Sequence, residues 1–317
     1  MPRYLITGAT GYLGQGLIGA LIADPGNHVH GVVRRLHAPP QGWLPLFGDV
    51  LSLNWQNMLA DIRPDVIVHL ASAPRHADLD TQMTVTVGST HALLEGVCQA
   101  RIKPRLFIPG SAAEYGSHPA PITETAPCLP VTVYGMAKFI QTQLARQYAQ
   151  EHHLPVVIGR VFNVYGQTPI HYPIADWAGQ IARMEAGGSL SHTISTRNMQ
   201  AIRDFVHRED VIDAILALIR HGKAGEIYNI GSGKSISLQA AFDTLVDCSL
   251  RRYLTAQPEG PQFEDICVAD IQKITQDTGW LPKHTLAEGL KDELAYWRHM
   301  VKTGQVEPKR QIAGGVE

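Results

Sequence analysis

Short apolar runs and amphipathic segments alternate along the first half of the chain. The apolar runs predict buried strands at Tyr4–Thr7, His28–Arg34, Asp65–Leu70, Arg105–Pro109 and Pro155–Val161. The segments Tyr12–Ile22 and Met83–Ala100 predict helices. Apolar strands that alternate with helices are typical of a parallel sheet covered on both faces. We therefore predict an α/β fold with a doubly wound parallel sheet.

The pattern changes after about Gly166. Glu209–Arg220 predicts an amphipathic helix, Glu226–Ile230 a strand, and Thr285–Met300 a helix with an aromatic face. We predict one domain over residues 1–166, with returning segments near 204–231, and a smaller, interleaved α/β lobe over residues 167–317. Trp280 and Trp297 are expected to pack in the core of the smaller lobe.

Composition narrows the range of partners. The chain has 317 residues, 44% of them hydrophobic, and a formal net charge of -2. A chain of this length can bury a large core. Because basic residues do not outnumber acidic ones, the charge argues against nucleic acid or a membrane surface as a partner. No apolar run approaches ~18 residues, so no membrane span is expected. Four scattered cysteines without zinc spacing predict free thiols, no metal site and a cytoplasmic location.

Three glycines follow the first predicted strand, in the segment TGATGYLG. Gly8 permits a tight turn out of the strand, Gly11 lets the backbone approach a pyrophosphate, and Gly14 lets the helix pack closely on the sheet. Because amide groups at a helix N-terminus face phosphates, the segment predicts a dinucleotide site and makes residues 1–166 a Rossmann domain. The residues expected to bind the cofactor here are Gly8, Thr10, Gly11, Tyr12, Leu13 and Gly14.

The end of the second predicted strand indicates which dinucleotide binds. An acidic residue there would bind the ribose 2′-hydroxyl of NAD, but this chain has Arg34 and Arg35. Two guanidinium groups suit a 2′-phosphate, so NADP(H) is favoured and NAD(H) stays possible. The alternative is a pair of solvated surface arginines. Further cofactor contacts are expected from Asp49 and Val50 at the adenine, and from Leu70, Ala71 and Ser72 beside the nicotinamide ribose.

Tyr134 and Lys138 form a candidate proton-transfer pair. They lie four residues apart in a predicted helix and so share a face. A tyrosine with a pKa of about 10 is a poor acid at neutral pH, but a nearby ammonium favours the phenolate. Ser111 follows the strand Arg105–Pro109, at the edge where open α/β sheets place ligands, and could hold a substrate oxygen. Val161 ends the next strand and is expected to contact the cofactor.

Together these motifs carry a family resemblance. From TGATGYLG through YGMAK, RVFNVYG, AIRDFVHREDV and EIYNIGSG to TGWLP, the chain resembles the extended short-chain dehydrogenase/reductase family of nucleotide-sugar epimerases, dehydratases and reductases. It is most similar to the group of GDP-mannose 4,6-dehydratases and GDP-4-keto-6-deoxy-mannose reductases. The resemblance implies a catalytic triad of Ser111, Tyr134 and Lys138, a nucleotide-sugar substrate and a homodimer formed through a helix bundle. It also implies that Asn163 and Arg203 touch the substrate's phosphates.

The branch of the family is read from the residues after Ser111. Dehydratases carry acids there, whereas this chain has Ala112 and Ala113, and Glu114 is expected to face elsewhere. We therefore predict an NAD(P)-dependent reductase of a 4-keto-6-deoxy sugar nucleotide, with Tyr134 as the acid. The alternatives are an epimerase with tightly bound NAD and a non-catalytic NADP-binding sensor.

Substrate contacts are less well defined by the sequence. Arg75 and His76, in the loop after the strand Asp65–Leu70, are pocket candidates. The arginine that the family uses in its C-terminal lobe to clamp a diphosphate is missing from AQPEGPQFEDICVAD. Arg251 and Arg252, a few residues upstream, could replace it.

Overall fold

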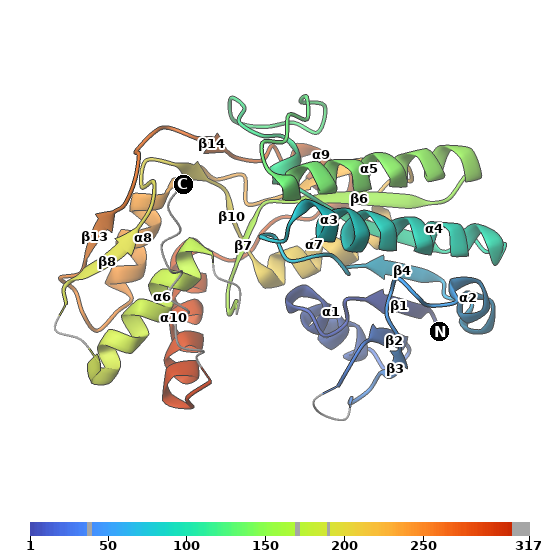
Figure 1. The fold of residues 1–317 in the computed structure, drawn as a ribbon, viewed down its shortest axis with the longest axis horizontal. Coiled ribbons are helices and arrows are strands. Elements are labelled where there is room, and N and C mark those ends of the chain that lie inside the picture. The colour runs from blue at the N-terminus through green and yellow to red at the C-terminus, as the bar shows by residue number, and fades with distance from the viewer. Residues whose placement is uncertain (37–39, 169–171, 189–190, 306–317) are drawn as a thin grey trace. The chain divides into compact units, whose positions relative to one another are not determined.

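Seven strands form one parallel sheet in the order β11-β6-β5-β4-β1-β2-β3 (Figure 1). The computed structural model describes residues 1–36, 40–168, 172–188 and 191–305. The strands are β1 (Arg3–Thr7), β2 (His28–Val33), β3 (Leu44–Phe47), β4 (Val66–His69), β5 (Arg105–Ser111), β6 (Val156–Val161) and β11 (Ile227–Ile230). The predicted doubly wound parallel sheet is confirmed.

Strand β3 was not predicted from the sequence. It is short, contains Pro45 and lies at the end of the strand order, where it pairs only with β2 in this sheet. Proline cannot donate to a sheet ladder and is tolerated at edges, so such a strand has no clear hydrophobic signal.

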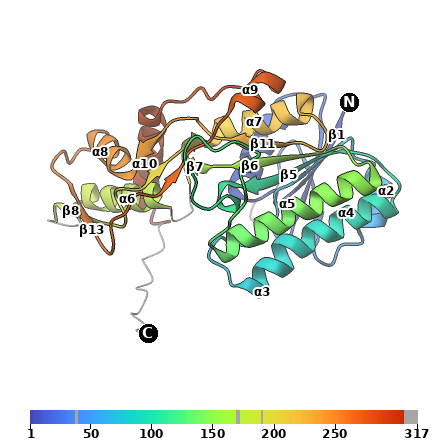
Figure 2. The same ribbon diagram turned by 90° about the horizontal axis from the view of Figure 1, so that it is seen from above.

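Helices cover both faces of this sheet (Figure 2). On one face lie α1 (Tyr12–Ile22), α7 (Arg208–His221) and α9 (Gln272–Thr278), and on the other lie α2 (Trp55–Ile62), α4 (Ser89–Gln99) and α5 (Val133–His152). A short helix, α3 (Leu79–Thr81), and a π-helical segment, Gln82–Gly88, precede α4. One 3₁₀ turn, Ala112–Glu114, follows β5.

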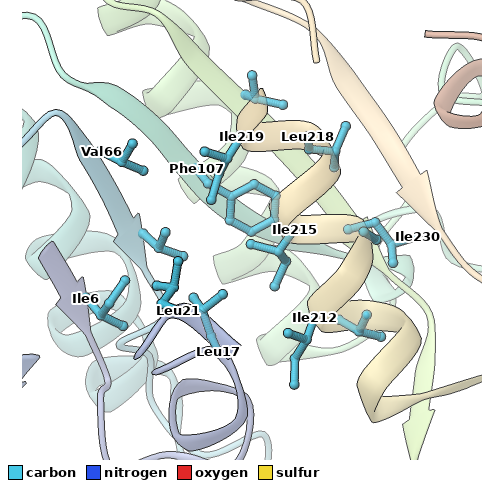
Figure 3. Packing of buried hydrophobic residues seen from close by; sticks show 14 of the residues in the cluster. Ile6, Leu17, Leu21, Val66, Phe107, Ile212, Ile215, Leu218, Ile219 and Ile230 are labelled. Atoms are coloured by element: carbon cyan, nitrogen blue, oxygen red, sulfur yellow. The ribbon is translucent and has the colours of Figure 1, made fainter. Parts of the chain in front are cut away.

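Alternate strand residues supply the two cores. Ile6 and Phe107 pack with Leu17 of α1 and Ile215 of α7, as Figure 3 shows. Their strand neighbours, such as Leu5, pack on the opposite face with α2 and α4. Because successive strand side chains point to opposite faces, strands that are apolar throughout require helices on both sides.

The chain divides into two compact units. The first comprises Met1–Val164, Ala201–Ile236 and Glu264–His284; the second comprises Tyr165–Gln200, Ser237–Phe263 and Thr285–Glu317. The division after Val164 lies close to the predicted boundary at residue 166. The return of Glu264–His284 to the first unit was not predicted, and it moves Trp280 out of the smaller lobe, where we expected that side chain.

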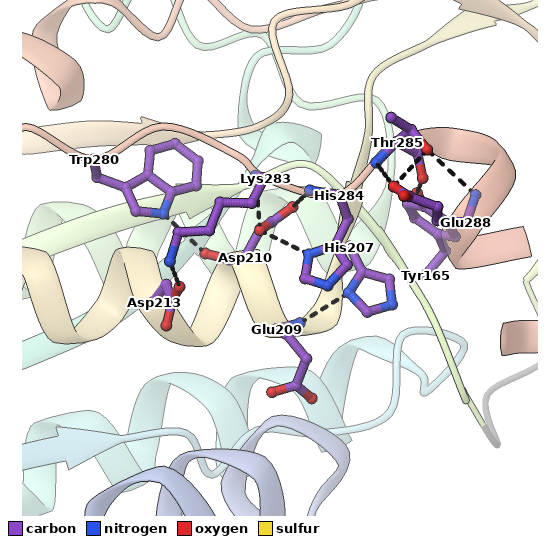
Figure 4. Close-up of polar contacts among 10 residues, drawn as sticks. All are labelled: Tyr165, His207, Glu209, Asp210, Asp213, Trp280, Lys283, His284, Thr285 and Glu288. Carbon is purple, nitrogen blue, oxygen red and sulfur yellow. Dashed lines mark hydrogen bonds and ion pairs between the residues drawn. The ribbon is translucent and has the colours of Figure 1, made fainter.

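Asp210 explains why Glu264–His284 belongs to the first unit. Its buried carboxylate, in the first turn of α7, accepts hydrogen bonds from the amides of Lys283 (3.0 Å) and His284 (3.1 Å) and pairs with His284 Nδ1 at 2.9 Å. The Asp210 carbonyl accepts from Trp280 Nε1 at 3.1 Å. Figure 4 shows these groups around the start of α7. The contacts join residues 70 to 74 positions apart, which local patterns do not reveal.

Small strands complete the fold. The strand β7 (Asn163–Tyr165) pairs with β10 (Phe205–His207), and β9 (Ile202–Arg203) lies between β12 (Ile236–Ser237) and β14 (Ile266–Cys267). In the second unit, β8 (Thr193–Thr196) pairs with β13 (Thr255–Pro258).

The second unit is built on three helices, α6 (Pro173–Arg183), α8 (Leu238–Asp247) and α10 (Leu286–Lys302). A π-helical segment, Met184–Gly188, continues α6. Trp177 and Phe242 meet edge to face with ring centroids 5.5 Å apart, and Trp297 is buried, as expected for the core of this lobe.

Glu293 of α10 is a buried acid in the second unit. One of its oxygens accepts from the amides of Gly166 (2.9 Å) and Thr168 (3.1 Å), and the other accepts from Trp297 Nε1 (2.9 Å). Burial raises the pKa of Glu293 to about 7, against the opposing effect of these donors. The side chain therefore fixes the segment that follows β7.

Replacing Gly14 should test the close approach of α1 to the glycine turn. A Cβ at Gly14 would lie 2.1 Å from the Gly8 carbonyl oxygen, so Gly14→Ala should lower the free energy of unfolding by about 1–3 kcal/mol. Gly19→Ala, in the same helix with no atom near its added Cβ, should instead raise it by about 0.5–1 kcal/mol. Urea denaturation measures both, and equal stability of the two variants would contradict the steric argument.

Glu293 should make stability depend on pH. Its folded pKa of about 7 exceeds the ordinary value of 4.5, so the folded chain retains a proton that the unfolded chain loses. The resulting stabilisation is complete below pH 4.5 and is lost as pH rises to 7, by about 2–3 kcal/mol. Denaturant titrations across this range should show a smaller decline for Glu293→Gln than for the parent. Parallel curves would show that Glu293 does not titrate as described.

Candidate active site

The glycine turn after β1 has the geometry that a dinucleotide requires. Gly8 has a φ of +66°, and a Cβ there would lie 2.8 Å from the Leu70 carbonyl carbon. Gly11 is the N-cap of α1 and brings no side chain to cover the first amides of the helix. The residues present thus fit a pyrophosphate at this helix N-terminus. Thr10 and Gly11 are exposed, whereas Gly14 is buried against the turn.

Arg208 holds the start of α1 from the neighbouring helix. Its Nε donates to the Tyr12 carbonyl at 3.1 Å, and its guanidinium carbon lies 5.0 Å from the centre of the Tyr12 ring. Tyr12 and Leu13 are half-buried in this position. The glycine turn is therefore supported by a side chain almost two hundred residues away in the sequence.

A groove of about 1200 Å³ adjoins the glycine turn. Its described lining includes Arg34 and Arg35, both exposed, together with Asp49 and the apolar side chains of Leu36 and Trp43. Asp49 is the acidic residue of this lining, and its Oδ1 accepts from the Leu51 amide at 2.9 Å. Two guanidinium groups beside an apolar wall fit a phosphorylated adenosine. The neighbouring Val50 is half-buried, and its carbonyl accepts from Trp55 Nε1.

The end of β4 lies against the glycine turn. The Leu70 backbone touches Gly8, and the Ala71 amide donates to Thr7 Oγ1 at 3.1 Å. Ser72 follows and is exposed. Leu70 and Ala71 therefore lie beside the turn. Their contact with the nicotinamide ribose stays a prediction.

Strand β5 and helix α5 bring the three proposed catalytic residues into one region. Ser111 ends β5 and lies opposite Val161 of β6 in the sheet register. Lys138 is buried, and its Nζ donates to the Pro109 carbonyl at 2.5 Å. A Cβ at Gly135 would lie 2.4 Å from the Ala113 carbonyl oxygen, so α5 begins directly on the turn that carries Ser111. Tyr134 lies in this first turn of α5, beside Gly135.

A buried polar chain extends from Lys138 below the site. Lys138 Nζ donates to Gln141 Oε1 at 2.5 Å, and Gln141 Nε2 donates to Thr90 Oγ1 at 2.6 Å. His69 joins Thr90 at 3.1 Å through Nε2 and Thr7 at 2.9 Å through Nδ1. Burial lowers the pKa of Lys138 to about 8, and burial together with the Lys138 charge lowers the pKa of His69 to about 3. The imidazole is therefore neutral and serves as a hydrogen-bonding link.

Arg75 lies beside Tyr134, the proposed acid. Its guanidinium carbon is 5.7 Å from the centre of the Tyr134 ring, which places the loop after β4 beside that side chain. His76 is exposed in the same loop. The structure thus brings Arg75 to Tyr134.

Asn163 and Arg203, which we expected to contact the substrate, form hydrogen bonds with residues of the first unit. Asn163 Nδ2 donates to the Asp204 carbonyl at 3.0 Å. Arg203 is paired with Asp265, through both the carboxylate and the carbonyl of that residue. Asp204 accepts from the amides of Ser232, Gly233 and Ala269, which gives the RDF and GSG motifs a structural role. Any binding of phosphate by Arg203 would compete with Asp265.

The replacement of the missing diphosphate arginine by Arg251 or Arg252 stays a prediction. Arg251 donates to the Met184 carbonyl at 2.7 Å within the second unit, and Arg252 is exposed.

Across the described parts of the chain, no group of three or more His, Cys, Asp or Glu side chains could hold a metal ion. None of the described helices combines the length and apolarity needed to cross a membrane.

Sequence reasoning missed the buried groups that support the site. Gln141, Thr90 and His69 carry no motif, because they meet only when α4, α5 and β4 are packed together. Glu114 did have a local signal. Ser111-Ala-Ala-Glu114 has the spacing of a capping box, and the structure contains that box, with the Glu114 carboxylate accepting from the Ser111 amide.

Comparison with known proteins places the chain in a family. The model of the "NAD dependent epimerase/dehydratase family" matches residues 4–231. A UDP-glucose 4-epimerase of Azospirillum brasilense is 28% identical over 95% of this chain and 93% of its own length. A dTDP-6-deoxy-L-talose 4-dehydrogenase (NAD(P)(+)) of Kitasatospora kifunensis is 27% identical over 92% and 94%.

A solved structure gives the same result for the fold. The UDP-glucuronic acid 4-epimerase of Bacillus cereus, in complex with UDP-glucuronic acid and NAD, superimposes with a TM-score of 0.80 at 26% identity, covering 94% of this chain and 99% of that one. The family model spans well over half of the sequence and includes the glycine turn, Ser111, Tyr134 and Lys138. The chain therefore belongs to the NAD-dependent epimerase/dehydratase family, the nucleotide-sugar branch of the extended short-chain dehydrogenases/reductases.

Proposed function

We propose that this protein reduces the 4-keto group of a 4-keto-6-deoxy sugar nucleotide, with NADPH as the favoured hydride donor. The observation that carries the proposal is the turn after β5, where Ser111 is followed by Ala112 and Ala113, and where the Ala113 carbonyl lies against Gly135 at the start of α5. The turn can hold a substrate oxygen but has no acid at the positions that dehydratases use. Its one carboxylate, Glu114, is bound to Arg160, Ser111 and Thr142.

The proposed chemistry assigns one task to each residue. A bound NADPH supplies the hydride to the carbonyl carbon. Tyr134 gives a proton to the oxygen that becomes the alcohol, and Ser111 donates a hydrogen bond to the same oxygen. Lys138, protonated at neutral pH, stabilises the phenolate that Tyr134 becomes. The similarity to a 4-dehydrogenase of a 6-deoxy sugar nucleotide supports this assignment, because reduction of a 4-ketone is the reverse of that reaction.

An epimerase is the second candidate, favoured by the similarity to a UDP-glucose 4-epimerase. It would use the same residues to oxidise C4 and then reduce it again, with NAD held throughout. Oxidised NAD released when the purified protein is denatured would favour this alternative. A non-catalytic NADP-binding sensor would bind NADPH but oxidise none of it with any ketone.

The preference for NADPH rests on Arg34 and Arg35, which line the groove beside the glycine turn. The cytoplasmic location, the homodimer through a helix bundle and the closeness to the GDP-mannose group stay predictions.

Removing the proposed acid should abolish turnover. Tyr134→Phe should lower the rate by about 10²–10⁴-fold, because the phenyl ring has no proton to give. NADPH affinity should change little, since the ring remains in place. The measurements are nicotinamide absorbance with a 4-keto-6-deoxy sugar nucleotide and a fluorescence titration of NADPH. Tyr253→Phe, at an exposed tyrosine of the second unit, is the control. Comparable rates for Tyr134→Phe and the parent would exclude this acid.

Removing both arginines should change the coenzyme preference. Changing Arg34 and Arg35 together to Ala should weaken NADPH binding relative to NADH by about 10–100-fold, since hydrogen bonds to a charged phosphate are lost. Isothermal titration with each coenzyme gives the ratio. Arg220→Ala, at an exposed arginine outside the groove lining, should leave the ratio unaltered. Unchanged discrimination in the double variant would mean that the pair is only a solvated surface feature.

A further inference from the structure

A buried ion pair lies directly beneath Ser111. Glu114 is fully buried and Arg160 of β6 is 2% exposed, and Arg160 Nε donates to Glu114 Oε2 at 2.9 Å. Burying two charges is costly unless both are well paired. Neither side chain has a part in the proposed proton or hydride transfer, so their presence at this point needs another explanation.

The Glu114 carboxylate connects the elements that carry the catalytic residues. Its Oε1 accepts from the Ser111 amide at 2.8 Å and from Thr142 Oγ1 at 3.1 Å. Thr142 lies one turn after Lys138 in α5, so one oxygen joins the Ser111 turn to the helix of Tyr134 and Lys138. The strand leaves room for it, because a Cβ at Gly110 would lie 2.6 Å from that oxygen.

The other partner of the pair is itself immobilised. The Arg160 guanidinium carbon lies 4.5 Å from the centre of the Tyr115 ring, and Nη1 donates to the Glu124 carbonyl at 3.3 Å. Tyr115 in turn donates to Asn229 Oδ1 at 2.7 Å. Arg160 therefore holds the carboxylate in one orientation. The bonds that Glu114 accepts, from Ser111, Thr142 and Arg160, all come from donors, which is the pattern expected for the ionised acid. Burial raises the pKa of Glu114, and the Arg160 charge and the Ser111 amide oppose that rise.

We propose that Glu114 is a positioning residue of the active site, which ties the Ser111 turn to α5 through Thr142 and places a buried negative charge about one helical turn from Lys138. The effect of Glu114 on catalysis rests on the proposed function, because that function assigns Lys138 to stabilise the phenolate of Tyr134.

The charges around Lys138 explain how Glu114 acts on it. Burial lowers the pKa of Lys138 to about 8, and the Glu114 charge opposes this shift. The other titratable groups that face this region are the neutral His69 of β4, Arg160 of β6 paired with Glu114, and Tyr134 of α5. Among these described groups, Glu114 is the one that carries negative charge. Without it, the pKa of Lys138 would fall below about 8.

Direct titration of Lys138 tests the inference in the free, full-length protein. Lysine labelled with ¹³C at Cε is followed by NMR across pH 5–11, and Lys138→Met identifies the signal. Glu114→Gln, of nearly equal size but uncharged, should lower the Lys138 midpoint by about one pH unit. Thr142→Val removes the hydrogen bond to α5 but keeps the charge, and should leave the midpoint in place. Glu114→Asp keeps the charge one methylene farther away and should give an intermediate midpoint.

The dependence of kcat/KM on pH tests the role of Glu114 separately from the proposed function. If the parent reduces a 4-keto-6-deoxy sugar nucleotide, the alkaline limb of kcat/KM should move to lower pH in Glu114→Gln and stay unmoved in Thr142→Val. Where Glu114→Gln does not fold, Glu114→Asp supplies both measurements. A parent without turnover refutes the proposed function, whereas an unmoved Lys138 midpoint in the Gln and Asp variants refutes the role of Glu114.

Discussion

The contact between the end of β5 and the start of α5 is the constraint on which the site depends. Lys138 donates to the Pro109 carbonyl of β5, and Gly135 leaves no room for a side chain against Ala113. Because Ser111 ends the same strand, this packing fixes the separation between the hydroxyl and the helix that carries Tyr134. The parallel sheet makes the arrangement possible, since the carboxyl ends of β1, β4, β5 and β6 lie at one edge.

The same edge unites the two halves of the site. The glycine turn follows β1 and touches the end of β4, so the proposed phosphate cradle and the proposed nicotinamide side meet where Gly8 approaches the backbone of Leu70 and Ala71. A polar chain then runs from Thr7 through His69, Thr90 and Gln141 to Lys138. Buried polar groups are costly unless each has a hydrogen-bond partner, and here the bonds connect β1 and β4 to α4 and α5.

Burial gives the charged groups of the site their particular properties. A lysine in water would be a simple cation, but burial brings its pKa close to neutrality, where neighbouring charges decide its state. Glu114 and Arg160 supply such charges in a fixed geometry. The turn has Ala112 and Ala113 where dehydratases carry acids, and we propose that its Glu114 supports Ser111 and Lys138 instead.

The sequence by itself determined the features that depend on neighbours along the chain. Strand and helix periods predicted the parallel sheet, and glycine spacing predicted the turn beside Leu70. The strand-end position of Ser111 and the four-residue spacing of Tyr134 and Lys138 predicted that the β5 end and the start of α5 meet, whereas their catalytic roles stay predictions. Only the tertiary structure decided which distant residues meet. The Glu114–Arg160 pair spans 46 positions, Gln141 and Thr90 are 51 apart, and Arg203 finds Asp265 after 62. The order of the strands brings those partners together, and pairs so far apart along the chain share no local pattern.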